Sequence, residues 1–261
     1  MNNEDFIARR TESFEYQFNH KLLDDAPIMI RVICRNFDLF NKEKPYDKLF
    51  TKWMQDTMKV LCEHFSIAGC RLGYTFSNEI ILLLRNTDSS SNIKTYLNYS
   101  IQNISSLCAS LATSAFYKSY YESIYKDLSR DIHKPITREI RIEKINVIFT
   151  VSCFNIPHAG INGYFSSKQQ DAIRRSIVAL GDTYLCYDNS DDWDSEVIKQ
   201  NVSSIHGINW DDFPNDYKLG SCCIKKLNSV SDTEYNTEWV IDHNIPLFKD
   251  DEGNYIDNNS F

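Results

Sequence analysis

The strongest constraint on the fold is a short apolar run, Ile80–Leu84, that closely follows a second segment with strand character. An uncharged run of this length is typical of a buried strand or a buried helix, and its two isoleucines favour a strand. We therefore predict strands at Leu72–Phe76 and Ile80–Leu84, joined by the tight turn Ser77-Asn78-Glu79. The turn would place polar side chains at the tip of a hairpin, where a carboxylate could meet a metal ion. An ordinary core hairpin with a solvated turn explains the same residues, because Asn and Ser favour turns for backbone reasons.

A further buried strand is predicted upstream, at Ile28–Ile33, and it runs into a turn that precedes the sequence Lys-Pro-Tyr-Asp at 44–47. A strand, a helix and a hairpin in this order predict an α+β fold, with an antiparallel sheet covered by helices on one face. The predicted helix spans residues 47–65, where apolar side chains recur with helical spacing. These side chains are Leu49, Phe50, Trp53, Met54, Met58, Leu61, Cys62 and Phe65.

Length and composition indicate a globular protein. The 261 residues predict one large domain, or one domain with an appendage. The formal net charge is −8 and the sequence pI is near 5.3, which excludes a protein that is basic over its whole surface. A local basic groove can still lie on an acidic protein, so nucleic-acid binding stays open.

The eight cysteines include no CxxC pair and are scattered through apolar runs. This pattern predicts reduced, mostly buried thiols in a cytoplasmic protein. The sequence shows neither a signal peptide nor a run of about 18 apolar residues, so we expect no membrane association.

Six motifs follow one another in the same order between Phe6 and Phe248 as in a known family. The first two contain Arg31, Arg35, Phe37, Lys44, Pro45, Asp47, Gly73, Tyr74, Thr75, Ser77 and Glu79. On these residues the chain resembles the tRNA-His guanylyltransferase family, including that family's 3′–5′ RNA polymerase relatives. The resemblance implies a polymerase-palm-like antiparallel sheet covered by helices, with a C-terminal helical and hairpin extension.

The resemblance also implies a metal site that this chain does not keep. In the family, two aspartates hold two metal ions; Ile33 and Asn78 stand at those positions here, and Cys34 replaces the glycine after the first aspartate. Isoleucine offers no ligand, and Asn78 offers a neutral carbonyl rather than the anion that Mg²⁺ prefers. We expect a buried Ile33 to let the turn pack drier than an aspartate would. Glu79 is the acid that remains at the hairpin tip, so we expect no bound metal.

Several charged positions of the family are also changed. The family's Arg and Lys that reach the triphosphate fall on Ser100 and Asn103, Ser152 replaces another Arg, and Arg175 replaces an Asn. Lys168 keeps the charge of an Arg but not its bidentate fork. The candidates retained for nucleotide or RNA binding are Arg35, Lys44, Asp47, Ser77, Ser106, Lys168, Gln169, Asp171, Ser176 and Lys218.

The domain organisation is predicted as a palm-like core at residues 1–145, with the remainder of the catalytic-type domain and its C-terminal extension at 146–261, and we expect both parts to fold as one compact unit. Residues 1–26 are predicted to be helical, and the last dozen residues to be frayed. Other predicted elements are a helical region at 96–125, a strand at 145–149, a short helix at 196–204, and a closing hairpin formed by 222–227 and 238–242.

Three functions remain open at this stage. The first is a catalytically inactive family member that binds nucleotide or RNA, or serves as a partner subunit, with no cofactor. The second is an active metal-dependent nucleotidyltransferase that adds nucleotides to RNA 5′ ends, using Mg²⁺, GTP or ATP, and substitute ligands such as Glu79 and Asp38. The third is a purely structural or regulatory protein. Expected partners are a nucleoside triphosphate or a tRNA or other RNA, and other copies of the chain in a dimer or tetramer, with or without an active relative.

Overall fold

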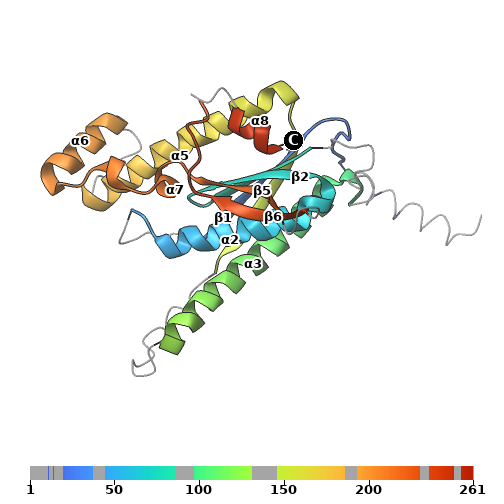
Figure 1. Cartoon of the computed structure of the whole chain (residues 1–261), viewed down its shortest axis with the longest axis horizontal. Coiled ribbons are helices and arrows are strands. Elements are labelled where there is room, and N and C mark those ends of the chain that lie inside the picture. Colours follow the sequence, from blue (N-terminus) through green and yellow to red (C-terminus); the bar gives the residue numbers. More distant parts are fainter. Residues whose placement is uncertain are drawn as a thin grey trace, which may run out of the picture.

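The computed structural model describes residues 20–37, 45–85, 97–130, 146–185, 193–229, 235–249 and 254–260, together with residues 11 and 14. Its strands are β1 (Ile28–Arg35), β2 (Cys70–Phe76), β3 (Glu79–Leu84), β4 (Ile148–Asn155), β5 (Ser221–Ser229) and β6 (Tyr235–Asp242). Its helices are α2 (Lys48–His64), α3 (Ile101–Arg130), α5 (Ile161–Tyr184), α6 (Ser195–His206), α7 (Asn215–Lys218) and α8 (Asn254–Ser260). Figure 1 shows their arrangement.

One antiparallel sheet organises the molecule, with the strand order β4-β1-β3-β2-β5-β6. The three strands predicted from apolar runs are present as β1, β2 and β3 and lie side by side, which confirms that part of the prediction. The closing hairpin is present as β5 and β6. Because β4 and β5 come from beyond residue 145 and pair with β1 and β2, both predicted parts of the chain contribute to the same sheet.

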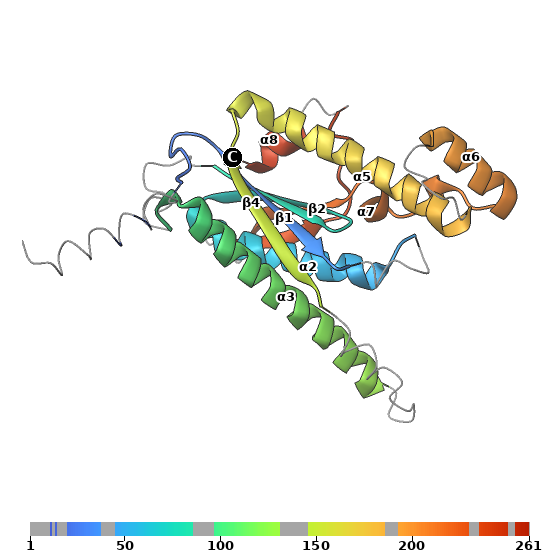
Figure 2. The same ribbon diagram turned by 180° about the vertical axis from the view of Figure 1, so that it is seen from behind.

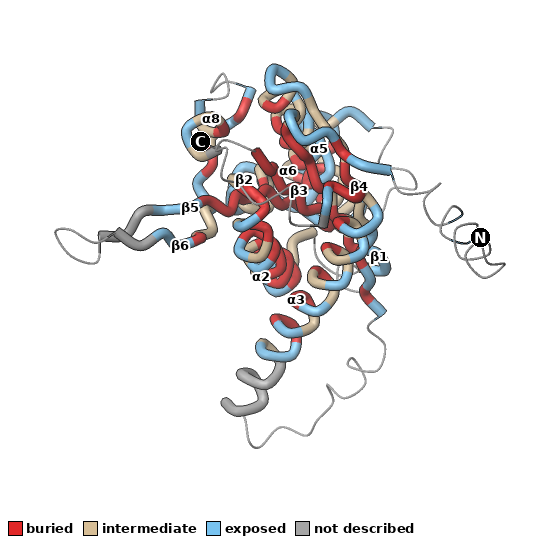
Figure 3. Tube along the Cα trace, turned by 90° about the vertical axis from the view of Figure 1, so that its right-hand side faces the viewer, coloured by how far each residue is buried: buried red, intermediate tan, exposed pale blue. Residues whose placement is uncertain are grey.

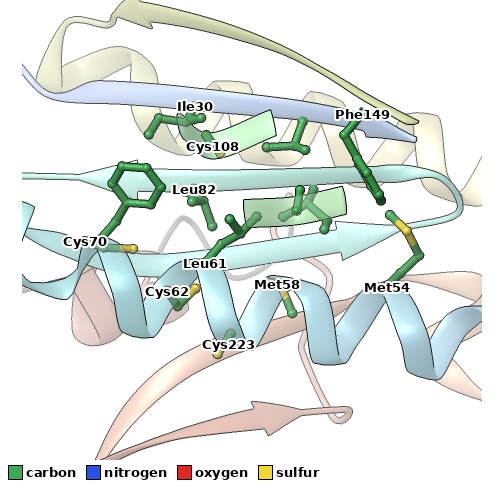
Figure 4. Packing of buried hydrophobic residues seen from close by; sticks show 14 of the residues in the cluster. Ile30, Met54, Met58, Leu61, Cys62, Cys70, Leu82, Cys108, Phe149 and Cys223 are labelled. Atoms are coloured by element: carbon green, nitrogen blue, oxygen red, sulfur yellow. The ribbon is translucent and has the colours of Figure 1, made fainter. Parts of the chain in front are cut away.

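Helices α2 and α3 cover one face of this sheet (Figure 2). The Asp47 carboxylate begins α2 by accepting hydrogen bonds from the backbone N–H groups of Leu49 and Phe50. The apolar stripe of α2, including Met58 and Leu61, then packs on side chains of β1 and β3 (Figure 4). The helix predicted at 47–65 is therefore confirmed, and its apolar periodicity exists because one side of it is buried in the core.

Helix α5 lies across part of the opposite face, which corrects the expectation that helices cover one face only. Its Phe165 packs in a second core with Tyr74 of β2 and Phe248 from the C-terminal segment, and the ring centroids are 5.6 to 6.4 Å apart. Tube colouring by burial shows the buried positions gathered in the strands and on the helix surfaces that face them (Figure 3). The sheet is thus a middle layer, and each face has its own core.

The prediction of a frayed C-terminus is wrong for residues 254–260, which form α8. The Ile256 side chain is fully buried in the second core, and the Asp257 carboxylate lies 3.6 Å from the Arg85 guanidinium. An acidic, Asn-rich composition predicts exposure, but this short helix is docked by Ile256, by the Asp257–Arg85 ion pair and by the Tyr255 hydroxyl, which donates to the Asp242 carboxylate at 2.7 Å.

Three predicted boundaries also need correction. The strand expected at 145–149 is β4 and runs to Asn155, because its backbone pairs with β1 over eight residues. The long helix starts at Ile101 rather than at residue 96 and continues to Arg130. Most of the helix predicted at 1–26 lies outside the described residues; Thr11 and Phe14 are helical, whereas residues 20–26 are not.

All seven cysteines among the described residues are buried free thiols, as their apolar surroundings predict. Within the described ranges, no helix combines the length and the apolar character needed to cross a membrane.

Gly73 allows α2 to approach the sheet closely. A Cβ atom added there would lie 2.5 Å from the Cys62 Sγ and 3.0 Å from the Met58 Cγ, both on α2. We predict that Gly73→Ala lowers the free energy of unfolding by about 1–3 kcal/mol, because overpacking forces the helix outward. Gly163→Ala in α5 is the control, because its Cβ would meet no atom of the described residues within 4 Å. Urea unfolding should show no loss of stability for the control, and equal stability of both variants would contradict the close approach.

Candidate functional site

The two former metal positions lie next to each other at the end of β1 and the tip of the β2–β3 hairpin. Ile33 is paired with Glu79 in the sheet register. One residue further on, the Cys34 backbone N–H donates to the Asn78 carbonyl at 2.8 Å, and the Asn78 Nδ2 donates to the Cys34 carbonyl at 3.0 Å. Ser77 makes the turn possible with a left-handed backbone, at φ 47°.

Glu79 is the centre of the site. Its side chain is only 1% exposed, and its two carboxylate oxygens accept a bidentate pair of hydrogen bonds from Arg31, at 2.7 and 2.8 Å. The Lys168 Nζ on α5 lies 2.9 Å from Oε1, and the Arg175 Nη2 lies 3.9 Å from Oε2. The acid that the sequence left available for a metal is therefore already surrounded by three cationic side chains.

The electrostatics of Glu79 follow from this arrangement. Burial alone would raise the pKa of the carboxyl group, but hydrogen bonds and charge from Arg31 and Lys168 outweigh it and hold the pKa below its usual value of 4.5. The neighbouring Tyr164 is affected in the opposite way, because burial first and the charge of Glu79 second raise its pKa to about 12. Near neutral pH, Glu79 is therefore an anion and Tyr164 stays protonated.

Arg175 links α5 to the other former metal position. Its Nη1 donates to the Asn78 Oδ1 at 3.3 Å, and its guanidinium lies 5.4 Å from the centre of the Phe76 ring. The sequence motif marked this residue only as a replacement for Asn. Its position beside Asn78 could not be read from the sequence, since the two residues are 97 apart along the chain.

Ile33 does not form the dry packing that its apolar character suggests. It is half-buried, and the end of β1 leaves Arg35 exposed, with its Nε donating to the Thr150 Oγ1 of β4 at 3.1 Å. The expectation that the isoleucine closes the former site as a fully buried side chain is wrong.

A small cleft lies between the start of α2, the hairpin tip and α5. Its volume is about 60 Å³, far below the roughly 300–1,000 Å³ typical of small-molecule sites. In this conformation it has room for a single small group rather than for a whole nucleotide. The polar residues that line it include Asp47, Ser77, Arg175, Ser176, Asp216 and Tyr217.

The cleft is also lined by the carboxylate of Asp216, which sequence reasoning missed. The Asp216 carboxylate accepts from the Tyr46 hydroxyl at 3.3 Å and lies 3.7 Å from the His243 Nδ1. The Gln55 Nε2 donates to the Asp216 Oδ2 at 3.5 Å and to the Ser221 Oγ at 3.1 Å. Burial and Asp216 raise the pKa of Tyr46 to about 12. Tyr46 stands in a retained motif, but nothing in its local sequence pointed to Asp216.

The other predicted binding residues are spread more widely. Gln169 is buried and holds the C-terminal segment, accepting from the Phe248 N–H at 2.7 Å and donating to the Pro246 carbonyl at 2.9 Å. Ser106 lies on α3, in the layer on the other face of the sheet, and donates to a carbonyl of its own helix. Lys218 donates to the Asp211 carbonyl.

Asp47, Ser77 and Ser176 line the cleft. Asp171 lies beside the Glu79 cluster, with its Oδ2 3.9 Å from the Lys168 Nζ. Lys44 and Asp38 are outside the described residues.

The donor set at the hairpin tip does not suit a divalent cation. Within the described parts of the chain, no group of three or more His, Cys, Asp or Glu side chains is placed to hold a metal ion. Among the described residues, Glu79 is the carboxylate beside the former metal positions, and releasing it would leave Arg31 and Lys168 without their shared partner. A hard cation prefers several oxygen ligands. The hairpin tip offers the Glu79 carboxylate, which is already paired with Arg31 and Lys168, and the Asn78 amide oxygen.

We predict that Glu79→Gln lowers the free energy of unfolding by about 3 kcal/mol at pH 7, because it leaves a buried cation cluster without its anion. The folded-state pKa of Glu79 is depressed, so its stabilising effect is full above the unfolded-state pKa and is lost as the pH falls through the folded-state value. The difference between wild type and variant should therefore shrink below about pH 4.5. Urea unfolding from pH 7 to pH 3 measures it.

The matched control for that experiment is Asp171→Asn, a half-exposed carboxylate 3.9 Å from the same lysine. We expect its effect to stay within about 0.5 kcal/mol. A Glu79→Gln variant as stable as wild type at pH 7 would contradict the proposed role of the cluster.

Comparison with known proteins assigns the chain to a family. The family model described as tRNAHis guanylyltransferase (Thg1) matches residues 8–149. No curated protein matches the chain. A solved bacterial tRNA(His) guanylyltransferase (Thg1)-like protein in complex with ATP is 24% identical, with a TM-score of 0.78, and the alignment covers 98% of this chain and 99% of that one.

Two further solved structures share the fold. A bacterial Thg1-like protein in complex with GTP is 22% identical with a TM-score of 0.75, over 98% of this chain and 99% of that one. The tRNA(His) guanylyltransferase of Saccharomyces cerevisiae is 19% identical with a TM-score of 0.62, over 91% and 98%. Because the family match spans more than half of the 261 residues, and the sheet and its helices have the same fold, the chain belongs to the tRNA-His guanylyltransferase family.

Proposed function

We propose that this chain is a family member that does not catalyse metal-dependent nucleotide addition and instead acts as a nucleotide- or RNA-binding subunit. The proposal rests on one observation: both carboxylate oxygens of Glu79 are paired with Arg31 or Lys168, at 2.7 to 2.9 Å. The positions of the two family aspartates hold Ile33 and Asn78.

The chemistry explains why this change matters. Phosphoryl and nucleotidyl transfer in a two-metal site needs two cations that align the attacking and leaving oxygens and offset the charge of the phosphates. Ile33 supplies no ligand, and the Asn78 amide accepts from Arg175. Glu79 would have to leave a buried bidentate ion pair before it could bind a cation, and breaking such a pair costs about 3–5 kcal/mol.

Binding is a separate matter from catalysis. Two solved structures with this fold are complexes with ATP and with GTP. The cleft in this chain keeps polar residues of the retained motifs, including Asp47 and Ser77, beside the cationic Arg175. These features support a nucleotide, or the phosphorylated end of an RNA, as the ligand. We further propose that the subunit acts within an oligomer of two or four chains, or together with an intact relative.

The direct test is a turnover assay with Mg²⁺, each nucleoside triphosphate and a 5′-monophosphorylated RNA. We expect no nucleotide addition, and we expect millimolar Mg²⁺ alone to leave the melting temperature unchanged, because the described hairpin tip holds no cation-binding carboxylate that is not already paired. Metal-dependent addition that Glu79→Ala abolishes would overturn the proposal in favour of an active enzyme with substitute ligands.

A second prediction concerns rebuilding the metal site. Ile33→Asp with Asn78→Asp restores both carboxylates, but the carboxylate introduced at position 78 would lie within about 4 Å of the Arg175 guanidinium and pair with it. Adding Arg175→Asn removes this competing cation. Calorimetric titration with Mn²⁺ should show binding at least about tenfold tighter for the triple variant than for the double variant.

The control for that comparison replaces Arg175→Asn by Arg174→Asn, which removes the same charge from an exposed neighbouring position on α5. We expect this second triple variant to bind Mn²⁺ no better than the double variant. Equal gains from both triple variants would show that Arg175 does not occupy the former metal site.

A further inference from the structure

The cluster at the hairpin tip contains more positive than negative charge. Arg31, Lys168 and Arg175 surround Glu79, and the nearest additional carboxylate, Asp171, is half-exposed and 3.9 Å from Lys168. Arg31 and Lys168 already satisfy both oxygens of Glu79 at short distances. Arg175, whose closest Glu79 oxygen is 3.9 Å away, therefore adds a charge that the carboxylate does not need.

Arg175 is also placed to contact a ligand. Its side chain is 45% exposed and lines the cleft. A guanidinium has five N–H donors. Among the described residues, the Arg175 guanidinium donates one hydrogen bond, from Nη1 to the Asn78 Oδ1. Asn78 and the Phe76 ring hold one edge and one face of the group. An oriented guanidinium fork of this kind matches the oxygens of a phosphate.

The remaining walls of the cleft are compatible with an anion at this end. The Ser77 hydroxyl is exposed beside Arg175. Two carboxylates also line the cleft, and each has partners of its own: Asp47 accepts from backbone N–H groups at the start of α2, and Asp216 accepts from Tyr46 and lies 3.7 Å from the His243 Nδ1. A volume of about 60 Å³ holds a few water-sized groups. That space suits one phosphate group, with the rest of the ligand extending into solvent.

We propose that Arg175 forms a metal-independent binding site for a phosphate group of a nucleoside triphosphate. The guanidinium takes the electrostatic role that a divalent cation has in a two-metal site, and it does so without any metal ligand. The choice of a nucleotide rests on the proposed function, whereas the anion site rests on the geometry of Arg175 alone. The affinity for the nucleotide should therefore be highest without Mg²⁺, because Mg²⁺ bound to the phosphates would repel Arg175.

The test is calorimetric titration of the full chain with ATP, and separately with inorganic triphosphate, first in EDTA and then in millimolar Mg²⁺. We expect both probes to bind in EDTA and to bind more weakly with Mg²⁺. Arg175→Gln should weaken both by about tenfold or more, because it removes charge-assisted hydrogen bonds. Arg175→Lys should recover part of the loss, because it keeps the charge without the fork.

Arg174→Gln is the matched control, since it removes the same charge from the same helix outside the cleft, and we expect a change of less than about twofold. Thermal melting of each variant checks that it folds. Binding that requires Mg²⁺, or equal losses for Arg175→Gln and Arg174→Gln, would overturn the proposal.

The two proposals can fail separately. A chain that adds no nucleotide and binds no phosphate in EDTA would leave the proposal of an inactive family member standing and remove the anion site. A chain that binds ATP in EDTA through Arg175 and also adds nucleotides with Mg²⁺ would support the anion site and overturn the proposal of an inactive family member.

Discussion

The buried carboxylate of Glu79 is the constraint on which the second face of the sheet depends. An ionised acid that is 1% exposed needs positive charge within hydrogen-bonding distance, and here that charge comes from β1 and from α5. Arg31 binds it from the adjacent strand, and Lys168 and Arg175 bring α5 down onto the hairpin tip. The same carboxylate therefore joins the sheet to the helix, and its oxygens bind Arg31 and Lys168 instead of remaining available as metal ligands.

The two faces of the sheet explain how a fold can persist while its site changes. The face under α2 and α3 is apolar. Packing α2 on it depends on the Asp47 cap at the start of the helix and on the absence of a side chain at Gly73. These requirements concern packing and hydrogen bonding within the chain, and the residues of the family pattern that meet them are retained. Two charged positions of the pattern, now Ser100 and Asn103, lie at the start of α3 on this face. Ser100 is buried there, and its Oγ accepts from the Asn103 N–H at 3.4 Å, so the replacement fits the packing of this layer.

The sequence predicted most of what depends on local pattern. The strands at 28–33, 72–76 and 80–84 and the helix at 47–65 could be predicted because apolar periodicity follows directly from a buried face. Neither α8 nor the second layer formed by α5 was predicted, since Ile256 and Phe165 are buried only by residues far away in the chain. The partners of Glu79 on α5 were not predictable for the same reason. Lys168 and Arg175 lie close to it in space but far from it along the chain, and no sequence spacing connects them.

The candidate site shows most clearly how charge has been redistributed. Relative to the family pattern, two negative side chains are replaced by the neutral Ile33 and Asn78, and a positive one is added at Arg175. Positive positions of the pattern are neutral here as well, among them Ser100, Asn103 and Ser152.

At the hairpin tip, the Arg175 guanidinium lies 3.3 Å from the side-chain oxygen of Asn78. Ser152, which replaces an Arg of the pattern, is paired with Arg31 on the neighbouring strand. Three cationic side chains around one buried carboxylate give this end of the sheet a positive local balance, and that balance is the physical basis of the proposed phosphate site.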